Sequence, residues 1–96
     1  MRCMLKIDVD TDAGNKAISD GTLPKIIQQV MDRTKPEATY YATESGCRSA
    51  YLFFDLADPA DIPLIAEPLF LHLGARVTIV PAMNSDDLQR GLAQLA

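Results

Sequence analysis

The stretch from Asp61 to Met83 constrains the fold more than any other part of the chain. Its first half repeats apolar residues at the helical spacing of three and four, which gives one broad apolar face: Ile62, Ile65, Ala66, Leu69, Phe70 and Leu73. Gly74 then stands where a helix commonly ends in a left-handed residue. In the next residues Val77 and Ile79 alternate with polar neighbours, which is typical of a half-buried strand. The stretch therefore predicts a helix that leads into a strand, each with one face to bury.

The chain has 96 residues, which predicts one small domain over residues 1–96. A chain of this size buries only about 60–65% of the surface of its unfolded state, so a second copy would help to stabilise it. Hydrophobic residues make up 48% and charged residues 23%, a composition typical of globular rather than disordered proteins.

Charge and apolar patterning argue against several classes of function. The net charge is −4 and no Lys/Arg cluster stands out, so we expect no nucleic-acid or anionic-membrane partner. The longest apolar runs, such as residues 69–73, are too short to cross a bilayer. The N-terminal residues lack the apolar block and cleavage site of a secretory signal, and Cys3 and Cys47 are expected as reduced thiols. By default, this indicates a cytoplasmic protein.

The first third of the chain predicts a strand and helical structure. Residues 2–9 alternate strictly, with one side apolar: Cys3, Leu5, Ile7 and Val9. Apolar residues then recur at helical spacing up to Met31, but residues 19–22 interrupt the pattern, so this region is either a kinked helix or two consecutive helices. The pair Lys35-Pro36 ends it, because the residue before a proline is displaced from the helical region.

The rest of the chain predicts a hairpin, the helix and strand described above, and a short closing helix. Residues 38–43 and 48–56 are rich in aromatic residues and threonine and flank a glycine-containing turn. Pro68 lies in the middle of the following helix and should kink it. After Pro81, residues 84–87 can cap a helix that carries leucines on one face, namely Leu88, Leu92 and Leu95.

The order of elements is β-α-β-β-α-β with a terminal helix, which predicts a ferredoxin-like four-stranded antiparallel sheet with helices on one face. The opposite face would carry Met4, Lys6, Asp8, Tyr51, Phe53, Asp55, Arg76, Thr78 and Val80. The second strand would add one of two sets, and we favour Thr39, Tyr41 and Thr43 over Ala38, Tyr40 and Ala42. Monomers seldom leave such a patch in water, so we predict a homodimer in which two sheets pair face to face.

Element order, length and the half-apolar open face resemble the dimeric α+β barrel superfamily. Within it, the segments AEPLF, LGA, PAM and DDLQRGL, between Ala66 and Leu92, are similar to a set of small uncharacterised bacterial proteins. The resemblance implies that two sheets close into one barrel. It does not select an activity, because the superfamily includes monooxygenases, isomerases, dehalogenating or haem-binding enzymes and binding modules.

His72 is the only histidine of the chain. It lies off the apolar stripe and near the end of its helix, so we interpret it as a surface residue that the helix dipole favours. Without a Cys/His cluster, no metal or cofactor is expected. The chain has no tryptophan, and its histidine does not lie on the barrel face. The polar site of the superfamily's cofactor-free monooxygenases therefore cannot be mapped onto this chain.

The candidate pocket in the barrel consists of Met4, Lys6, Asp8, Tyr41, Tyr51, Phe53, Asp55, Arg76 and Thr78. Our leading prediction is that it binds a small aromatic or anionic organic molecule. The alternative is an isomerase or lyase of small carbonyl or aromatic acids that needs no metal or cofactor and uses Lys6, Tyr51 and Asp55. In a third interpretation Met4, Phe53 and the tyrosines pack the barrel shut and leave no cavity. The alternative to a ligand role for the charged residues is that Lys6 and Arg76 only form ion pairs with Asp8 or Asp55 near the barrel mouth.

Overall fold

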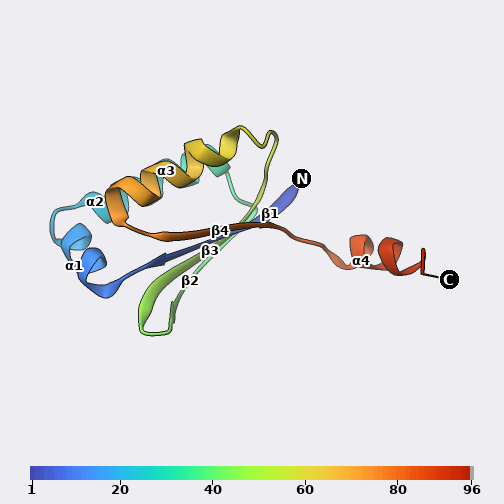
Figure 1. Cartoon of the computed structure of the whole chain (residues 1–96), viewed down its shortest axis with the longest axis horizontal. Helices are drawn as coiled ribbons and strands as arrows, with labels where there is room; N and C mark the ends of the chain where they lie inside the picture. The colour runs from blue at the N-terminus through green and yellow to red at the C-terminus, as the bar shows by residue number, and fades with distance from the viewer. Residues whose placement is uncertain (96) are drawn as a thin grey trace.

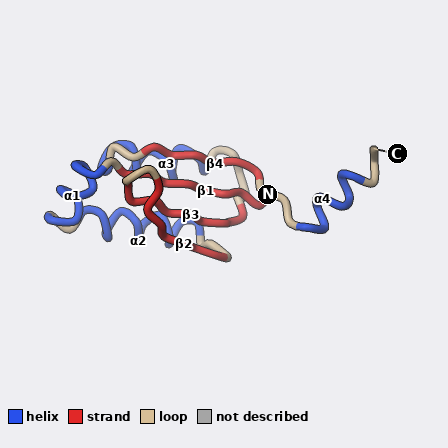
Figure 2. Tube along the Cα trace, turned by 90° about the horizontal axis from the view of Figure 1, so that it is seen from below, coloured by secondary structure: helices blue, strands red, loops and turns tan. Residues whose placement is uncertain are grey.

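A computed structural model describes residues 1–95 and shows an α+β architecture. The elements in chain order are β1 (Arg2–Val9), α1 (Thr11–Ser19), α2 (Thr22–Thr34), β2 (Ala38–Glu44), β3 (Cys47–Asp55), α3 (Asp61–Leu73), β4 (Arg76–Pro81) and α4 (Ser85–Leu92). The strands form one antiparallel sheet in the order β2-β3-β1-β4. Helices α1, α2 and α3 lie on one face of this sheet, and the other face is open (Figures 1 and 2). The predicted α+β class with a four-stranded antiparallel sheet is confirmed.

The core lies between the sheet and the helices. In β1 the alternate residues Cys3, Leu5 and Ile7 are buried, as the strict alternation predicted. In α3 the buried residues are Ile65, Ala66, Leu69 and Leu73. Phe70, which we expected in the same stripe, is 45% exposed, because the buried stripe is narrower than the apolar pattern and Phe70 lies at its edge.

The region between β1 and β2 contains two helices, which settles the alternative that the sequence left open. Gly21 separates them with a φ of 81°, in the left-handed region that glycine adopts without strain. In contrast, α3 continues through Pro68 as one element and ends at Gly74, which has a φ of 56°. The Ala75 N–H then donates to the Leu69 carbonyl over 3.2 Å, which is the bond of a Schellman-type helix end.

Helix α4 forms an arm that projects past the end of the sheet (Figures 1 and 2). Its start is capped twice, because Asn84 accepts from the Asp87 N–H over 2.8 Å and Asp87 accepts from the Asn84 N–H over 3.0 Å. The predicted leucine face exists, but it does not pack on the body of the chain, since no residue of α4 is buried. Within residues 1–95, none of the helices is both long and apolar enough to span a membrane.

Candidate functional site

The open face of the sheet is the candidate site, and strand pairing determines which residues share it. In an antiparallel sheet, directly paired residues point to the same side. Lys6 pairs with Tyr51 on one side and Thr78 on the other, and Tyr51 also pairs with Tyr40. The same alternation places further residues on this face: Ala38, Ala42 and Glu44 from β2, Met4 and Asp8 from β1, Ser49 and Phe53 from β3, and Arg76 and Val80 from β4.

The register that we favoured for the second strand is wrong. Tyr41 pairs with Ala50, which belongs to the buried core, so Tyr41 points to the helix-covered face and is not part of the open face. Thr39 lies on that face too, and its hydroxyl contacts the sulfur of Met31 in α2 at 3.7 Å. Tyr40 takes the place that we expected for Tyr41. The open-face set is therefore the alternative one.

The turn between β2 and β3 sets this register. Glu44 pairs with Cys47, so only Ser45 and Gly46 form the turn, with φ values of 52° and 76°. Two positive φ values in a two-residue loop are typical of a type I′ hairpin turn. Counting back from such a turn places Tyr40 opposite Tyr51. The Ser-Gly pair is therefore the sequence signal that could have identified the register.

The open face has an apolar end and a polar end. Met4 pairs with Phe53 and with Val80, and these three residues form the apolar end, beside the start of the arm. The polar end lies toward the hairpin turn and contains Lys6, Asp8, Glu44, Ser49 and Tyr51. These residues come from three neighbouring strands, so the sheet holds them in fixed relative positions.

Hydrogen bonds and ion pairs connect the polar end into one cluster. The Tyr51 hydroxyl donates to Oε1 of Glu44 over 2.6 Å, and Nζ of Lys6 contacts Oε2 of the same carboxylate. Nζ of Lys6 also lies 3.5 Å from Oδ2 of Asp8 and 5.7 Å from the centre of the Tyr51 ring. The buried hydroxyl of Ser49 donates to Oδ1 of Asp8 over 2.6 Å. One lysine is thus held between two carboxylates and over an aromatic ring.

These contacts stabilise ordinary protonation states at neutral pH. The hydrogen bond from Lys6 to Glu44 raises the pKa of Lys6, and the charge of Asp8 adds a smaller increase. The hydrogen bond from Lys6 lowers the pKa of Glu44 most, and the hydrogen bond from Tyr51 lowers it further. The same bond to Glu44 raises the pKa of Tyr51. These shifts favour the ammonium form of Lys6, the carboxylate form of Glu44 and the neutral phenol of Tyr51. A lysine that acts as a base needs a lowered pKa, so this environment opposes that role.

The structure does not bring Asp55 to Lys6 and Tyr51. Asp55 lies four residues along β3 from Tyr51, roughly 13 Å at about 3.3 Å per residue, and its Oδ1 pairs with the N-terminal amine over 2.6 Å. Glu44 occupies the position that we expected Asp55 to fill. The sequence analysis missed Glu44 because it assigned this residue to the turn.

Arg76 lies at the rim and pairs with Asp10 over 2.6 Å, rather than with Asp8 or Asp55. That hydrogen bond raises the pKa of Arg76.

Cys3 is buried, as expected, and His72 is exposed near the end of α3. Among residues 1–95 no group of three or more His, Cys, Asp or Glu side chains could hold a metal ion.

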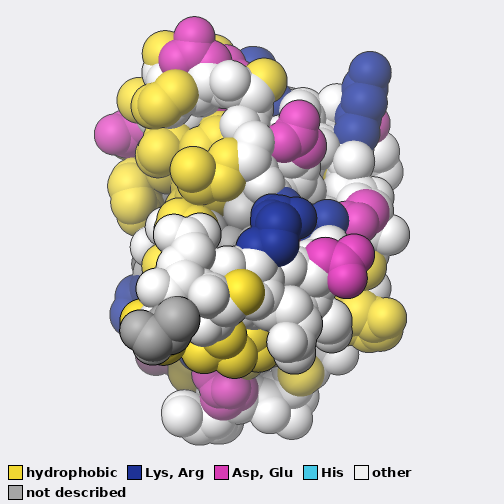
Figure 3. Space-filling view, turned by 90° about the vertical axis from the view of Figure 1, so that its right-hand side faces the viewer, with side chains coloured by type: hydrophobic (Ala, Val, Ile, Leu, Met, Phe, Trp, Pro, Cys, Tyr) yellow, Lys and Arg dark blue, Asp and Glu magenta, His cyan; other side chains and the backbone are white. Residues whose placement is uncertain are grey.

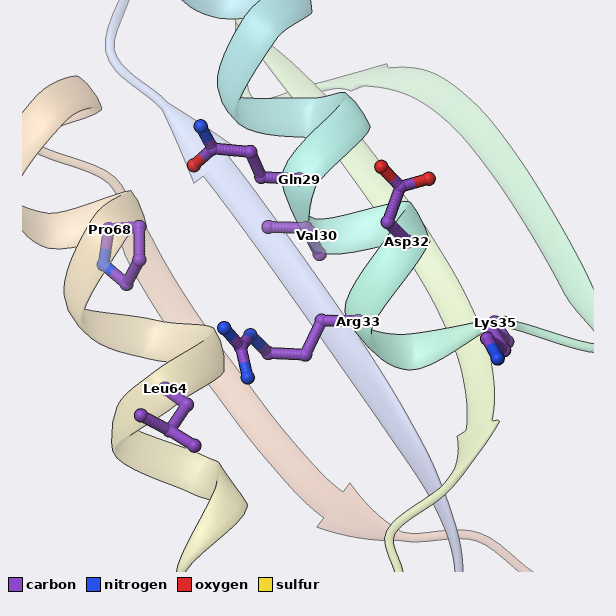
Figure 4. Close-up of a pocket in the computed structure, with 7 residues that line it drawn as sticks. All are labelled: Gln29, Val30, Asp32, Arg33, Lys35, Leu64 and Pro68. Atoms are coloured by element: carbon purple, nitrogen blue, oxygen red, sulfur yellow. The ribbon is translucent and has the colours of Figure 1, made fainter.

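Hollows also occur away from the open face. One lies between α2 and α3, with a volume of about 540 Å³, where Arg33 extends from α2 toward Leu64 on α3 (Figure 4). A smaller apolar hollow of about 220 Å³ lies beside Tyr41 on the helix-covered face. Neither contains the charged network of the open face, which is why we place the candidate site on the sheet.

Comparison with models of known protein families, with curated proteins and with solved structures finds no match to this chain. The α+β architecture therefore rests on the structure itself. The function has to be argued from the chemistry of the open face.

Proposed function

We propose that this chain is half of a ferredoxin-like dimeric α+β barrel, in which two open faces pair and hold a small organic molecule. The observation that carries the proposal is the polar cluster of Lys6, Asp8, Glu44, Ser49 and Tyr51, set at one end of an aromatic and apolar face that the chain's own helices leave uncovered. In a single chain this cluster lies on a surface. A second sheet would convert it into an enclosed site.

The apolar end supports the pairing of two sheets. Met4, Phe53 and Val80 are large apolar residues on a face with no covering layer, and Val80 is 39% exposed. Contiguous apolar patches on soluble proteins commonly mark interaction sites. Two sheets that pack face to face lie about 10 Å apart, so side chains from both would meet and exclude water.

The charges of the polar end favour one kind of ligand. Asp8 and Glu44 together outweigh the single positive charge of Lys6, so an anion would meet a net negative site. A neutral aromatic molecule with a hydrogen-bond donor fits better, because its donor can reach a carboxylate oxygen while its ring stacks on Tyr51. Of the two expected ligand classes, aromatic and anionic, we therefore propose the aromatic one.

The alternative of a cofactor-independent isomerase or lyase has less support. Asp55 lies at the far end of its strand, and the raised pKa of Lys6 favours its charged form. Both features suit a binding site, in which charges stay fixed, better than a site that must move protons.

The test combines the oligomeric state with binding of two simple probes, p-cresol as a neutral phenol and benzoate as an anion. Analytical ultracentrifugation gives the mass, and saturation-transfer NMR follows each probe. We expect a dimer that binds p-cresol saturably and more tightly than benzoate. Removal of the Tyr51 ring in Tyr51→Ala should weaken p-cresol binding at least about tenfold.

Tyr41→Ala is the matched control, because it removes the same ring from the neighbouring strand on the opposite face. We expect Tyr41→Ala to bind p-cresol as the unmodified protein does. A monomer at micromolar concentration would contradict the barrel. A dimer that binds neither probe, or one in which both variants lose the same affinity, would contradict the proposed site.

A further inference from the structure

We infer that α4 docks on a second copy of the chain, so that the leucine face of each arm is buried in the interface between the two copies. This inference rests on the proposed pairing of the open faces and extends it. It assigns the arm as an interaction surface and a second copy of the chain as its partner.

The first argument is that α4 has an apolar face that no residue among 1–95 of its own chain buries. Leu88, Leu92 and Leu95 follow one another at helical spacing and are 44%, 50% and 78% exposed, and Met83 at the base of the arm is 72% exposed. No residue of α4 is buried. Isolated helices shorter than about 12–15 residues are marginal in water, so this eight-residue helix needs packing to persist.

The second argument is that local contacts direct the arm away from its own helices. The Ala82 N–H donates to the Arg2 carbonyl over 3.0 Å, which extends the pairing of β4 with β1 past the last strand residue. Arg2 also forms an ion pair with Asp87 over 3.2 Å, and so ties the first turn of α4 to the end of the sheet. The arm therefore projects past the end of the sheet instead of folding back over the helix layer (Figure 1).

The third argument is continuity between the arm and the apolar end of the open face. Val80 pairs with Met4, and the chain runs directly from Val80 through Pro81 to Met83 and the arm. The charged cluster lies at the other end of the sheet, where it does not interrupt this surface. Figure 3 views the molecule from the arm end, where hydrophobic side chains lie among polar and charged ones. One partner that covers the apolar end is thus placed to cover the arm as well.

The fourth argument concerns interface size. With strands of six to nine residues, the open face measures roughly 19 Å by 20–30 Å, a flat area of about 400–550 Å². Stable interfaces bury roughly 800 Å² of accessible surface on each partner, so area from outside the sheet would strengthen the pairing. Helix α4 adds a surface about 12 Å long and about 10 Å wide, and in a two-fold dimer this contribution is made twice. A second copy that pairs with the open face is therefore placed to gain the area of the arm as well.

The test measures dimer dissociation by analytical ultracentrifugation for three variants of the full chain. Leu88→Asp combined with Leu92→Asp places charge on the leucine face, and we expect the dissociation constant to rise at least about tenfold. Gln89→Asp puts the same kind of charge on an exposed polar position of α4 and should leave dissociation within about twofold. Val80→Asp alters the open face and reports on the pairing of the sheets.

The outcomes separate the arm from the sheet. If Val80→Asp weakens the dimer and the double leucine variant does not, the arm is not in the interface and the inference is wrong, while the pairing of the sheets stands. If Val80→Asp leaves the dimer unchanged, the proposed pairing of open faces fails. A double leucine variant that keeps its dimer affinity but melts at lower temperature would show that α4 packs on its own chain, which also overturns the inference.

Discussion

Replacing Leu69 with alanine tests the packing of the core most directly. Leu69 is 0% exposed and lies in the middle of the buried stripe of α3, among core residues of the sheet and α2. Truncating a buried leucine to alanine costs about 2.7–5.0 kcal/mol, because the transfer free energy of the lost atoms adds to the cost of the cavity. We expect the free energy of unfolding to fall by about 3–4 kcal/mol in Leu69→Ala, since strand residues below and α2 beside it limit collapse of the cavity.

A loss of this size is easy to measure in a small domain. Single domains have free energies of unfolding of about 5–15 kcal/mol, and each kcal/mol shifts Tm by roughly 4–8 °C at this chain length. Urea unfolding followed by circular dichroism should therefore show a lower midpoint with an unchanged slope. All variants are compared at one protein concentration, because the proposed dimerisation would make apparent stability depend on concentration.

Leu71→Ala is the matched control, because Leu71 lies two residues further along α3 and is 76% exposed. Its free energy of unfolding should change by less than about 0.5 kcal/mol. Equal losses in Leu69→Ala and Leu71→Ala would refute the reasoning, because they would show that the outer side of α3 is as tightly packed as its inner side.

Two further predictions concern the hairpin and the polar cluster. Gly46→Ala should destabilise the protein by about 1–2 kcal/mol in urea unfolding, because Gly46 has a φ of 76°. The added methyl group meets open space, so only backbone strain acts. Gly91→Ala, in α4, is the control and should not destabilise the protein. Contacts with Lys6 and Tyr51 lower the pKa of Glu44, so below about pH 4.3 the unfolded chain binds more protons and stability falls as the pH falls. Glu44→Gln should make this fall shallower below about pH 4.3; identical pH dependence in both proteins would contradict the Glu44 contacts.

The local elements of this protein could be predicted from its sequence. Strict alternation in β1 indicated which side chains are buried, and the apolar spacing of α3 followed by Gly74 indicated where that helix ends. The double cap at Asn84 and Asp87 was likewise visible as a run of capping residues before the last helix. Each of these features depends on neighbours within a few residues, which is the range over which periodicity and capping act.

The composition of the open face could be predicted only in part. Met4, Lys6, Tyr51 and Phe53 lie on it as expected, because each belongs to a strand with a clear pattern. In β2 both faces carry a tyrosine, so alternation could not choose between Tyr40 and Tyr41, and a shift of one residue exchanges the faces. The two-residue turn made that choice.

The tertiary structure alone decided which charges meet and where the arm lies. Lys6 and Glu44 are 38 residues apart and come together because β2, β3 and β1 are neighbours in the sheet. Arg2 and Asp87 are 85 residues apart, and their contact ties α4 to the end of the sheet. Hydrophobic periodicity records which side of an element is buried, but it carries no information about the element on the other side. The sequence therefore determined the faces of this protein, and strand order, register and the path of the chain after β4 determined what those faces bring together.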